Sequence, residues 1–139
     1  MNILTVSGNM VTLVYNPARD HVEVGDSIAI IDRDENRGVL VQIIATHIPE
    51  LPGILLEVIR REALSEESYT YGLREAETYK RAVERMKYAE ARIIMEVRRV
   101  DNRLVYERWS GYVPSRNAEF IRVSAGEVIN ALRRRRAQT

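Results

Sequence analysis

The chain has 139 residues, enough for one modest hydrophobic core and too few for two self-sufficient domains. Apolar residues make up 45% and charged residues 29%, which excludes an intrinsically disordered or membrane-embedded chain. The net charge is only +1, so the protein as a whole has no positive electrostatic field that would attract nucleic acid. The absence of cysteine excludes disulfides and thiolate chemistry. We therefore expect a single cytoplasmic domain.

The N-terminus has no basic stretch followed by a continuous apolar segment. The longest apolar runs are far shorter than the roughly 20 residues that a membrane-spanning helix needs. We expect neither a signal peptide nor a membrane partner.

The first half of the chain alternates short β-branched runs with turn signals. Residues 3–7 and 10–15 flank Gly8 and Asn9, and both turn residues tolerate a positive φ. This segment therefore predicts a β-hairpin with a two-residue turn.

A second hairpin is predicted after it. Gly25 and Asp26 mark a turn or bulge that enters a strong strand, and Gly38 belongs to the polar, turn-forming residues 32–38. Residues 39–46 are rich in Val, Leu and Ile, which is typical of a strand that is buried on both faces.

A further strand-like run occupies residues 54–61, and the character of the sequence then changes. Helix formers predominate between about residues 64 and 89, and their apolar spacing predicts an inserted amphipathic helix over roughly residues 73–88. Its mixed charges indicate a solvated face.

The strand pattern returns in the second half. Residues 93–98 and 104–109 alternate apolar and polar side chains on either side of Asp101 and Asn102, which predicts another two-residue hairpin. A last short run covers residues 119–123.

The end of the chain predicts a C-terminal helix over about residues 125–135. Ser124 and Glu127 have the spacing of a capping box. We expect the helix to bury Val128, Ile129 and Leu132. The inventory is mainly β and predicts one domain over residues 1–139, a small barrel of six to eight strands with one inserted and one C-terminal helix.

No catalytic, cofactor or metal motif is present in the sequence. The seven glycines are too scattered for a Walker A phosphate loop, G-x-x-x-x-G-K-[ST]. Asp32, Asp34 and Asn36 resemble the start of a calcium loop, but Arg37 and Ile43 stand where that loop needs glycine and glutamate. The chain is therefore expected to be neither an enzyme nor a metal or cofactor protein.

An aromatic group in the second half is one candidate for nucleic-acid contact. Tyr106, Trp109 and Tyr112 lie beside Arg103 and Arg108, a combination on which bases can stack. The alternative is that these rings fill the interior of the barrel.

A run of arginines is the other candidate. It consists of Arg133, Arg134, Arg135 and Arg136, whose charges would neutralise phosphates. The alternatives are a solvated helix end that complements the helix dipole, or a linker into a missing domain.

Residues 22–30, which contain the turn V-x-V-G-D, and residues 37–43 together resemble the opening of the HAS barrel. That barrel is shared by HerA-type DNA-translocating ATPases and the N-terminal part of rotary ATP synthase subunits. An upstream hairpin, the V-x-V-G-D turn and strand, a polar turn with glycine and a returning strand follow one another in the family. A variable, often helical insertion comes next, in a place similar to residues 64–89.

The resemblance implies a mechanical role. HAS barrels form a collar on a hexameric ring, and in HerA-type systems they offer a docking surface for a partner nuclease. HerA-type proteins continue into a motor domain with a phosphate loop, so we expect this chain to be an excised or separately encoded barrel. Our hypothesis is a non-catalytic assembly or adaptor domain of a HerA-like DNA translocase, with a homo-oligomeric ring, a nuclease and DNA as partners. The alternative is a stand-alone nucleic-acid-binding β-barrel.

Overall fold

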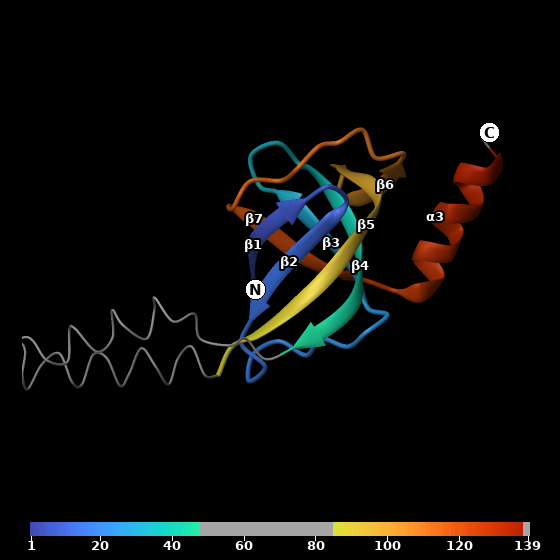
Figure 1. Ribbon diagram of the computed structural model, residues 1–139. Coiled ribbons are helices and arrows are strands. Elements are labelled where there is room, and N and C mark those ends of the chain that lie inside the picture. The colour runs from blue at the N-terminus through green and yellow to red at the C-terminus, as the bar shows by residue number, and fades with distance from the viewer. Residues whose placement is uncertain (48–84, 138–139) are drawn as a thin grey trace, which may run out of the picture.

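The computed structural model describes residues 1–47 and 85–137 (Figure 1). This part of the chain is mainly β, with seven antiparallel strands in one sheet and a C-terminal helix, which confirms the predicted fold class. The strands are β1 (Asn2–Ser7), β2 (Met10–Tyr15), β3 (Ser27–Asp32), β4 (Arg37–His47), β5 (Lys87–Val100), β6 (Arg103–Glu107) and β7 (Ala118–Val123). The helix is α3 (Ala125–Ala137).

The inserted helix predicted over residues 73–88 and the strand-like run at residues 54–61 lie outside the described residues, apart from the last four positions of the helix. There the prediction is wrong, because Lys87 and Tyr88 open strand β5 and pair with β2. Tertiary pairing with a β-branched neighbour overrides the helical spacing of this segment.

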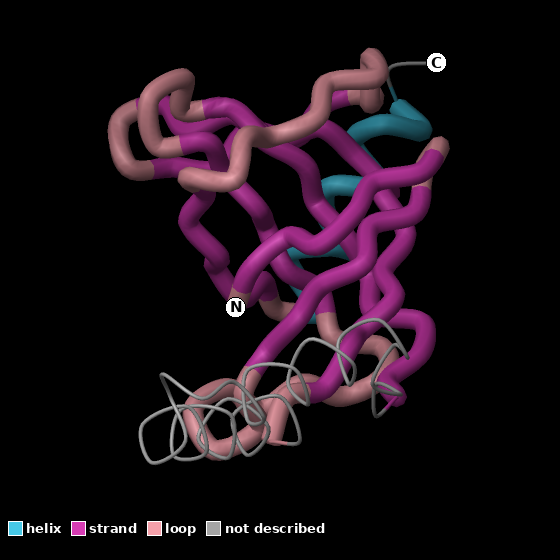
Figure 2. The backbone as a smooth tube through the Cα atoms, turned by 60° about the vertical axis from the view of Figure 1, so that its left-hand side comes forward, coloured by secondary structure: helices cyan, strands magenta, loops and turns pink. Residues whose placement is uncertain are grey.

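The sheet has the strand order β1-β2-β5-β4-β3-β7, and β6 pairs with β5. β5 is long enough to pair with β4 along one edge and with β2 and then β6 along the other. The strands curl around a common interior (Figure 2). Among the described residues the hydrogen-bonded ladder does not close into a full barrel, because β1 and β7 end the strand order.

Two of the hairpins have the turn chemistry that the sequence predicts. Gly8 has a φ of 58° between β1 and β2, and Asp101 and Asn102 have φ values of 51° and 61° between β5 and β6. In the β5–β6 turn, positive φ at both central residues matches the twist of the flanking strands; in the β1–β2 turn only Gly8 has a positive φ, and Asn9 does not.

The predicted turn at Gly25 and Asp26 connects three strands. Gly25 has a φ of 96° and its N–H donates to the Ile43 carbonyl at 2.8 Å, while the Ile43 N–H donates to the Asp26 carbonyl at 2.8 Å. The Asp26 carboxylate accepts from the Glu23 N–H at 2.9 Å and from Arg122 of β7 at 3.2 Å. The start of β3 is thereby fastened to β4 and β7.

Gly38 has a different role from the predicted one. It lies inside β4, opposite Ile31, and not in the turn. The turn covers residues 33–36 and reaches positive φ at Asn36. A Cβ on Gly38 would overlap the Ile30 carbonyl, so glycine is required here by the close approach of β3.

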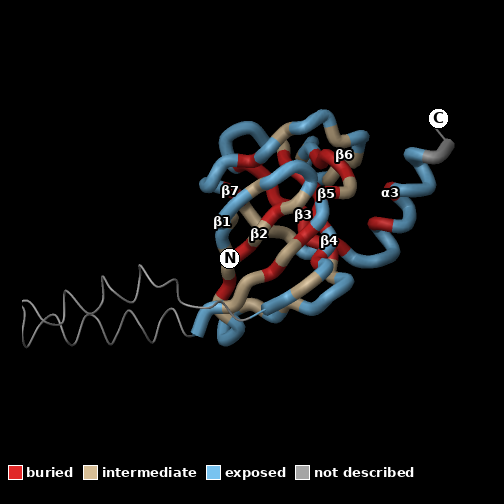
Figure 3. The backbone as a smooth tube through the Cα atoms, viewed as in Figure 1, coloured by how far each residue is buried: buried red, intermediate tan, exposed pale blue. Residues whose placement is uncertain are grey.

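The sheet buries side chains on both faces, and Figure 3 shows the buried positions gathered along the central strands. The inner cluster comprises Val11, Leu13, Tyr15, Ile28, Ile30, Val39, Val41, Ile43, Ala89, Ala91, Ile93 and Ala118. The outer cluster, beneath α3, comprises Ala29, Ile31, Leu40, Met95, Val97, Val123, Val128 and Ala131. This double burial explains why β3 is buried at all six positions.

A β-bulge in β5 exchanges the two faces midway. Leu40 pairs with Met95 and Val41 pairs with Ile93, which leaves Ile94 as an extra residue. Ile93 therefore belongs to the inner cluster and Met95 to the outer one, although simple alternation would place both on one face.

The C-terminal helix begins as predicted. The Ser124 hydroxyl accepts the Glu127 N–H at 3.2 Å, which satisfies one of the free donors at the helix start. Within the described part of the chain, no helix has the length and apolar character needed to cross a membrane.

The buried face of α3 differs from the predicted one. Val128 and Ala131 are buried, whereas Ile129 and Leu132 are 50% and 39% exposed. The helix rests on the sheet along one narrow stripe, and most of its surface is exposed (Figure 3).

Candidate functional site

A buried carboxylate fastens the loop between β6 and β7 at one end of the sheet. Both oxygens of Glu96 are engaged: one accepts the N–H and hydroxyl of Ser110 at 3.2 and 2.6 Å, and the other accepts the Arg37 Nε–H at 2.9 Å. Arg37 also stacks on the Tyr112 ring, 4.3 Å from its centroid. Glu96 is only 1% exposed, so this pairing compensates the cost of burying its charge.

Asp32 holds the same loop from β3. Its carboxylate accepts the Tyr112 hydroxyl at 3.3 Å and the Ser115 N–H at 3.2 Å, and the Trp109 indole N–H donates to the Tyr112 carbonyl at 2.8 Å. Asp32, Arg37, Glu96, Ser110 and Tyr112 are called the polar network below.

Hydrogen bonds to the ionised carboxylates determine the direction in which the pKa values of Glu96 and Asp32 are shifted. Burial raises the pKa of Glu96, but hydrogen bonds from Ser110 and Arg37 outweigh it and hold that pKa below its ordinary value. The pKa of Asp32 is lowered in the same way, against its desolvation, by Ser115, Asp34 and Tyr112. A carboxylate kept ionised by filled acceptor positions makes a poor general base, so the network fits a structural role.

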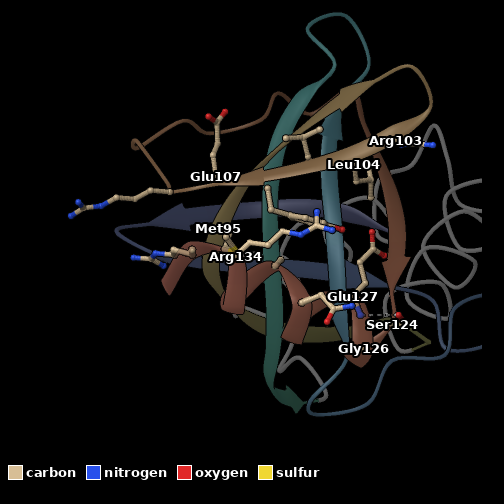
Figure 4. A pocket seen from close by; sticks show the side chains of 14 residues that line it. Met95, Arg103, Leu104, Glu107, Ser124, Gly126, Glu127 and Arg134 are labelled. Atoms are coloured by element: carbon tan, nitrogen blue, oxygen red, sulfur yellow. Dashed lines mark hydrogen bonds between the residues drawn. The ribbon is translucent and has the colours of Figure 1, made fainter. Parts of the chain in front are cut away.

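A groove between β6 and α3 is the second feature (Figure 4). Its volume is about 890 Å³. It is lined by Met95, Arg103, Leu104, Val105, Tyr106, Glu107, Arg108, Ser124, Gly126, Glu127, Asn130, Ala131, Arg134 and Arg135. We call it the arginine groove.

Arginines outnumber carboxylates in the lining of the arginine groove, four to two. Arg103 lies at the end where α3 begins, and Arg134 lies farther along α3 (Figure 4). Among the described residues Arg103, Arg108 and Arg134 have neither an ion pair nor a hydrogen bond, whereas Glu107 is occupied by Arg98 at 2.6 Å. The unpaired guanidinium groups leave donors for an anionic partner.

The floor of the groove is apolar. Met95 is buried beneath it, and Leu104 and Tyr106 are half-buried against the outer cluster. Burial and the neighbouring Glu127 carboxylate raise the pKa of Tyr106 far above its usual range, so this hydroxyl stays neutral.

The backbone of β6 forms one wall of the groove. β6 pairs only with β5 in the described part of the chain, so its other edge is unpaired. Val100 and Arg103 flank a two-residue turn and form a hydrogen-bonded pair, and such pairs alternate along the hairpin. Leu104 and Tyr106 therefore direct their N–H and C=O groups toward the free edge.

The predicted nucleic-acid residues separate into distinct environments. The groove brings Arg103 and Arg108 of the β6 segment together with Arg134 and Arg135 of α3, although about 30 positions divide them in the sequence. Arg133 is exposed and does not line the groove, and the side chain of Arg136 lies outside the described residues.

The aromatic residues do not form one exposed platform. Trp109 packs against the inner cluster, Tyr106 against the outer one, and Tyr112 lies beneath Arg37. Sequence reasoning missed Glu96 and Arg37, and the only signal that could have found them is a glutamate within the apolar core of β5.

The last features considered are a possible metal site in the described residues and the similarity of the chain to known proteins. No group of three or more His, Asp or Glu side chains within residues 1–47 and 85–137 is placed to hold a metal ion. No protein-family model and no curated protein sequence matches the chain.

Proposed function

We propose that the chain is a non-catalytic assembly domain: a cytoplasmic barrel-like module that joins copies into the collar of a HerA-like DNA-translocating ATPase and docks a partner nuclease there. The observation that carries the proposal is the pair of sheet edges, β1 and β7, which end the strand order and have no further strand beside them within residues 1–47 and 85–137. Unpaired strand edges are natural joining surfaces because their backbone groups accept another strand.

The two edges differ, which determines how copies would join. β1 of one copy would add to β7 of the next, a head-to-tail contact. Contacts of this kind form a closed ring when the rotation between neighbours divides the circle. The hexameric ring implied by the HAS-barrel resemblance is one such closure.

The V-x-V-G-D turn supports the same proposal. Gly25 and Asp26 connect β3 to β4 and β7 through the bonds described above, so the residues that carry the resemblance also organise the sheet. The polar network adds support, because its carboxylates hold the β6–β7 loop and are not directed at a ligand site.

The edge of β1 offers a direct test. Leu4 is 45% exposed and lies where the β1–β2 register shifts between Ile3 and Thr5. A lysine at the edge disfavours strand addition. Leu4→Lys should lower the mass of the assembly measured by sedimentation equilibrium, while Val24→Lys, at a 64% exposed loop position, should leave it unchanged. Equal masses for both variants and the wild type would remove β1 from the interface.

The alternative function is nucleic-acid binding. The arginine groove favours an anionic ligand, and guanidinium groups contact phosphates well. Base stacking, however, requires exposed rings, and Tyr106, Trp109 and Tyr112 are engaged with the protein interior or with Arg37.

A further inference from the structure

We infer that the arginine groove captures an extended acidic polypeptide segment of a partner protein, which adds as a strand to the free edge of β6. The inference deepens the proposed adaptor role and rests on it, because it specifies the surface and the chemistry of the partner. It follows from two properties of the groove: its backbone edge and its charge.

The backbone edge selects a polypeptide. The N–H and C=O groups of Leu104 and Tyr106 that point away from β5 are spaced to bond every second residue of an added strand. A nucleic acid has no matching alternation of donors and acceptors.

The charge of the groove selects an acidic partner. Arg103, Arg108 and Arg134 form no ion pair among the described residues, and they line the groove from two segments, Arg103 and Arg108 from the β6 segment and Arg134 from α3. Carboxylates at alternate positions of an added strand, on the side that faces α3, would meet Arg108 and Arg134 with charge-assisted hydrogen bonds.

The remaining positions of the segment turn away from α3. β-branched residues suit these positions because they favour the extended conformation of an added strand. The expected partner segment therefore alternates acidic and β-branched residues.

The probe for the test is a fluorescein-labelled peptide, Glu-Val-Glu-Val-Glu-Val-Glu, whose binding is followed by fluorescence anisotropy at low and high salt. Two further peptides carry N-methyl groups, one on all Glu amides and one on all Val amides. Because alternate amides point to opposite sides of a strand, one methylated peptide should lose binding and the other should keep it.

The protein variants test the charge of the groove. Arg108→Ser combined with Arg134→Ser should weaken peptide binding about tenfold, since two ion pairs to the peptide are lost. The matched control combines Arg116→Ser with Arg133→Ser, two exposed arginines outside the groove, and should stay within about twofold of the wild type.

Three results would overturn the inference: equal binding of both methylated peptides, equal binding of a peptide with Lys in place of Glu, or displacement of the peptide by oligothymidylate that itself binds more tightly. The mass of each sample is measured alongside. Lost peptide binding in samples that still assemble contradicts this inference alone, whereas samples that never assemble contradict the proposed function.

Discussion

Arg37 and Arg134 show two uses of the same side chain in one domain. Arg37 bonds the buried Glu96 at 2.9 Å and covers the Tyr112 ring, and its charge holds the β6–β7 loop in place. Arg134 lies exposed in the arginine groove with no partner among the described residues. The comparison separates residues that maintain the fold from residues whose donors remain available for binding.

The largest effect is expected in the polar network. Arg37→Ala leaves the Glu96 carboxylate buried without its counter-charge, and should lower the free energy of unfolding by about 3 kcal/mol in urea titrations. Arg134→Ala, the matched change in the groove, should stay within about 0.5 kcal/mol of the wild type. Equal losses of unfolding free energy in the two variants would contradict the division into an arginine that maintains the fold and one that is available for binding.

A second, smaller effect tests the turn that fastens β3. Gly25 has a φ of 96°, and a Cβ added there would meet no neighbouring atom. Gly25→Val should therefore be destabilised by backbone strain alone, by about 2 kcal/mol. Gly126→Ala, in helix α3, should instead be neutral or slightly stabilising. An unchanged thermal midpoint for Gly25→Val would contradict this account of the turn.

The seating of α3 provides a third comparison. Val128→Ala removes buried side-chain atoms under the groove wall and should cost about 1 kcal/mol, while Ile129→Ala, at a 50% exposed position, should cost much less. Thermal melts of the two variants measure the difference, and the reverse order would place the opposite face of α3 on the sheet.

The smallest effect is expected when acid protonates the carboxylates of the polar network. The pKa values of Asp32 and Glu96 lie below their ordinary values of 3.8 for aspartate and 4.5 for glutamate. Their stabilisation is therefore complete above those ordinary values and is lost as the pH falls through the lower, folded-state values. The urea midpoint should drop as the pH is lowered from about 7 to about 3, and Glu96→Gln should show a shallower drop. An unaltered slope in that variant would mean that Glu96 does not contribute.

Much of the fold is predictable because its signals are local. The hairpins at Gly8 and at Asp101 and Asn102, the Gly25 turn and the Ser124 cap each depend on residues adjacent in sequence. Sequence reasoning places Gly38 in the wrong element because its requirement comes from Ile30 on a neighbouring strand.

The candidate sites depend on information that the sequence pattern does not carry. Simple alternation puts Glu96 on the solvent face of β5, but the bulge at Ile94 turns it toward the interior. The arginine groove exists only because α3 folds back beside β6, which joins two arginine groups from separate segments. Tertiary packing decides both.

The central claim is that this chain assembles without nucleic acid. The most direct measurement is the solution mass by light scattering over a range of concentrations, at low and high salt, with and without short single- and double-stranded oligonucleotides. The account predicts a ring or a concentration-dependent oligomer whose mass is unaffected by oligonucleotide. A monomer that gains mass only when oligonucleotide is added at low salt would contradict it.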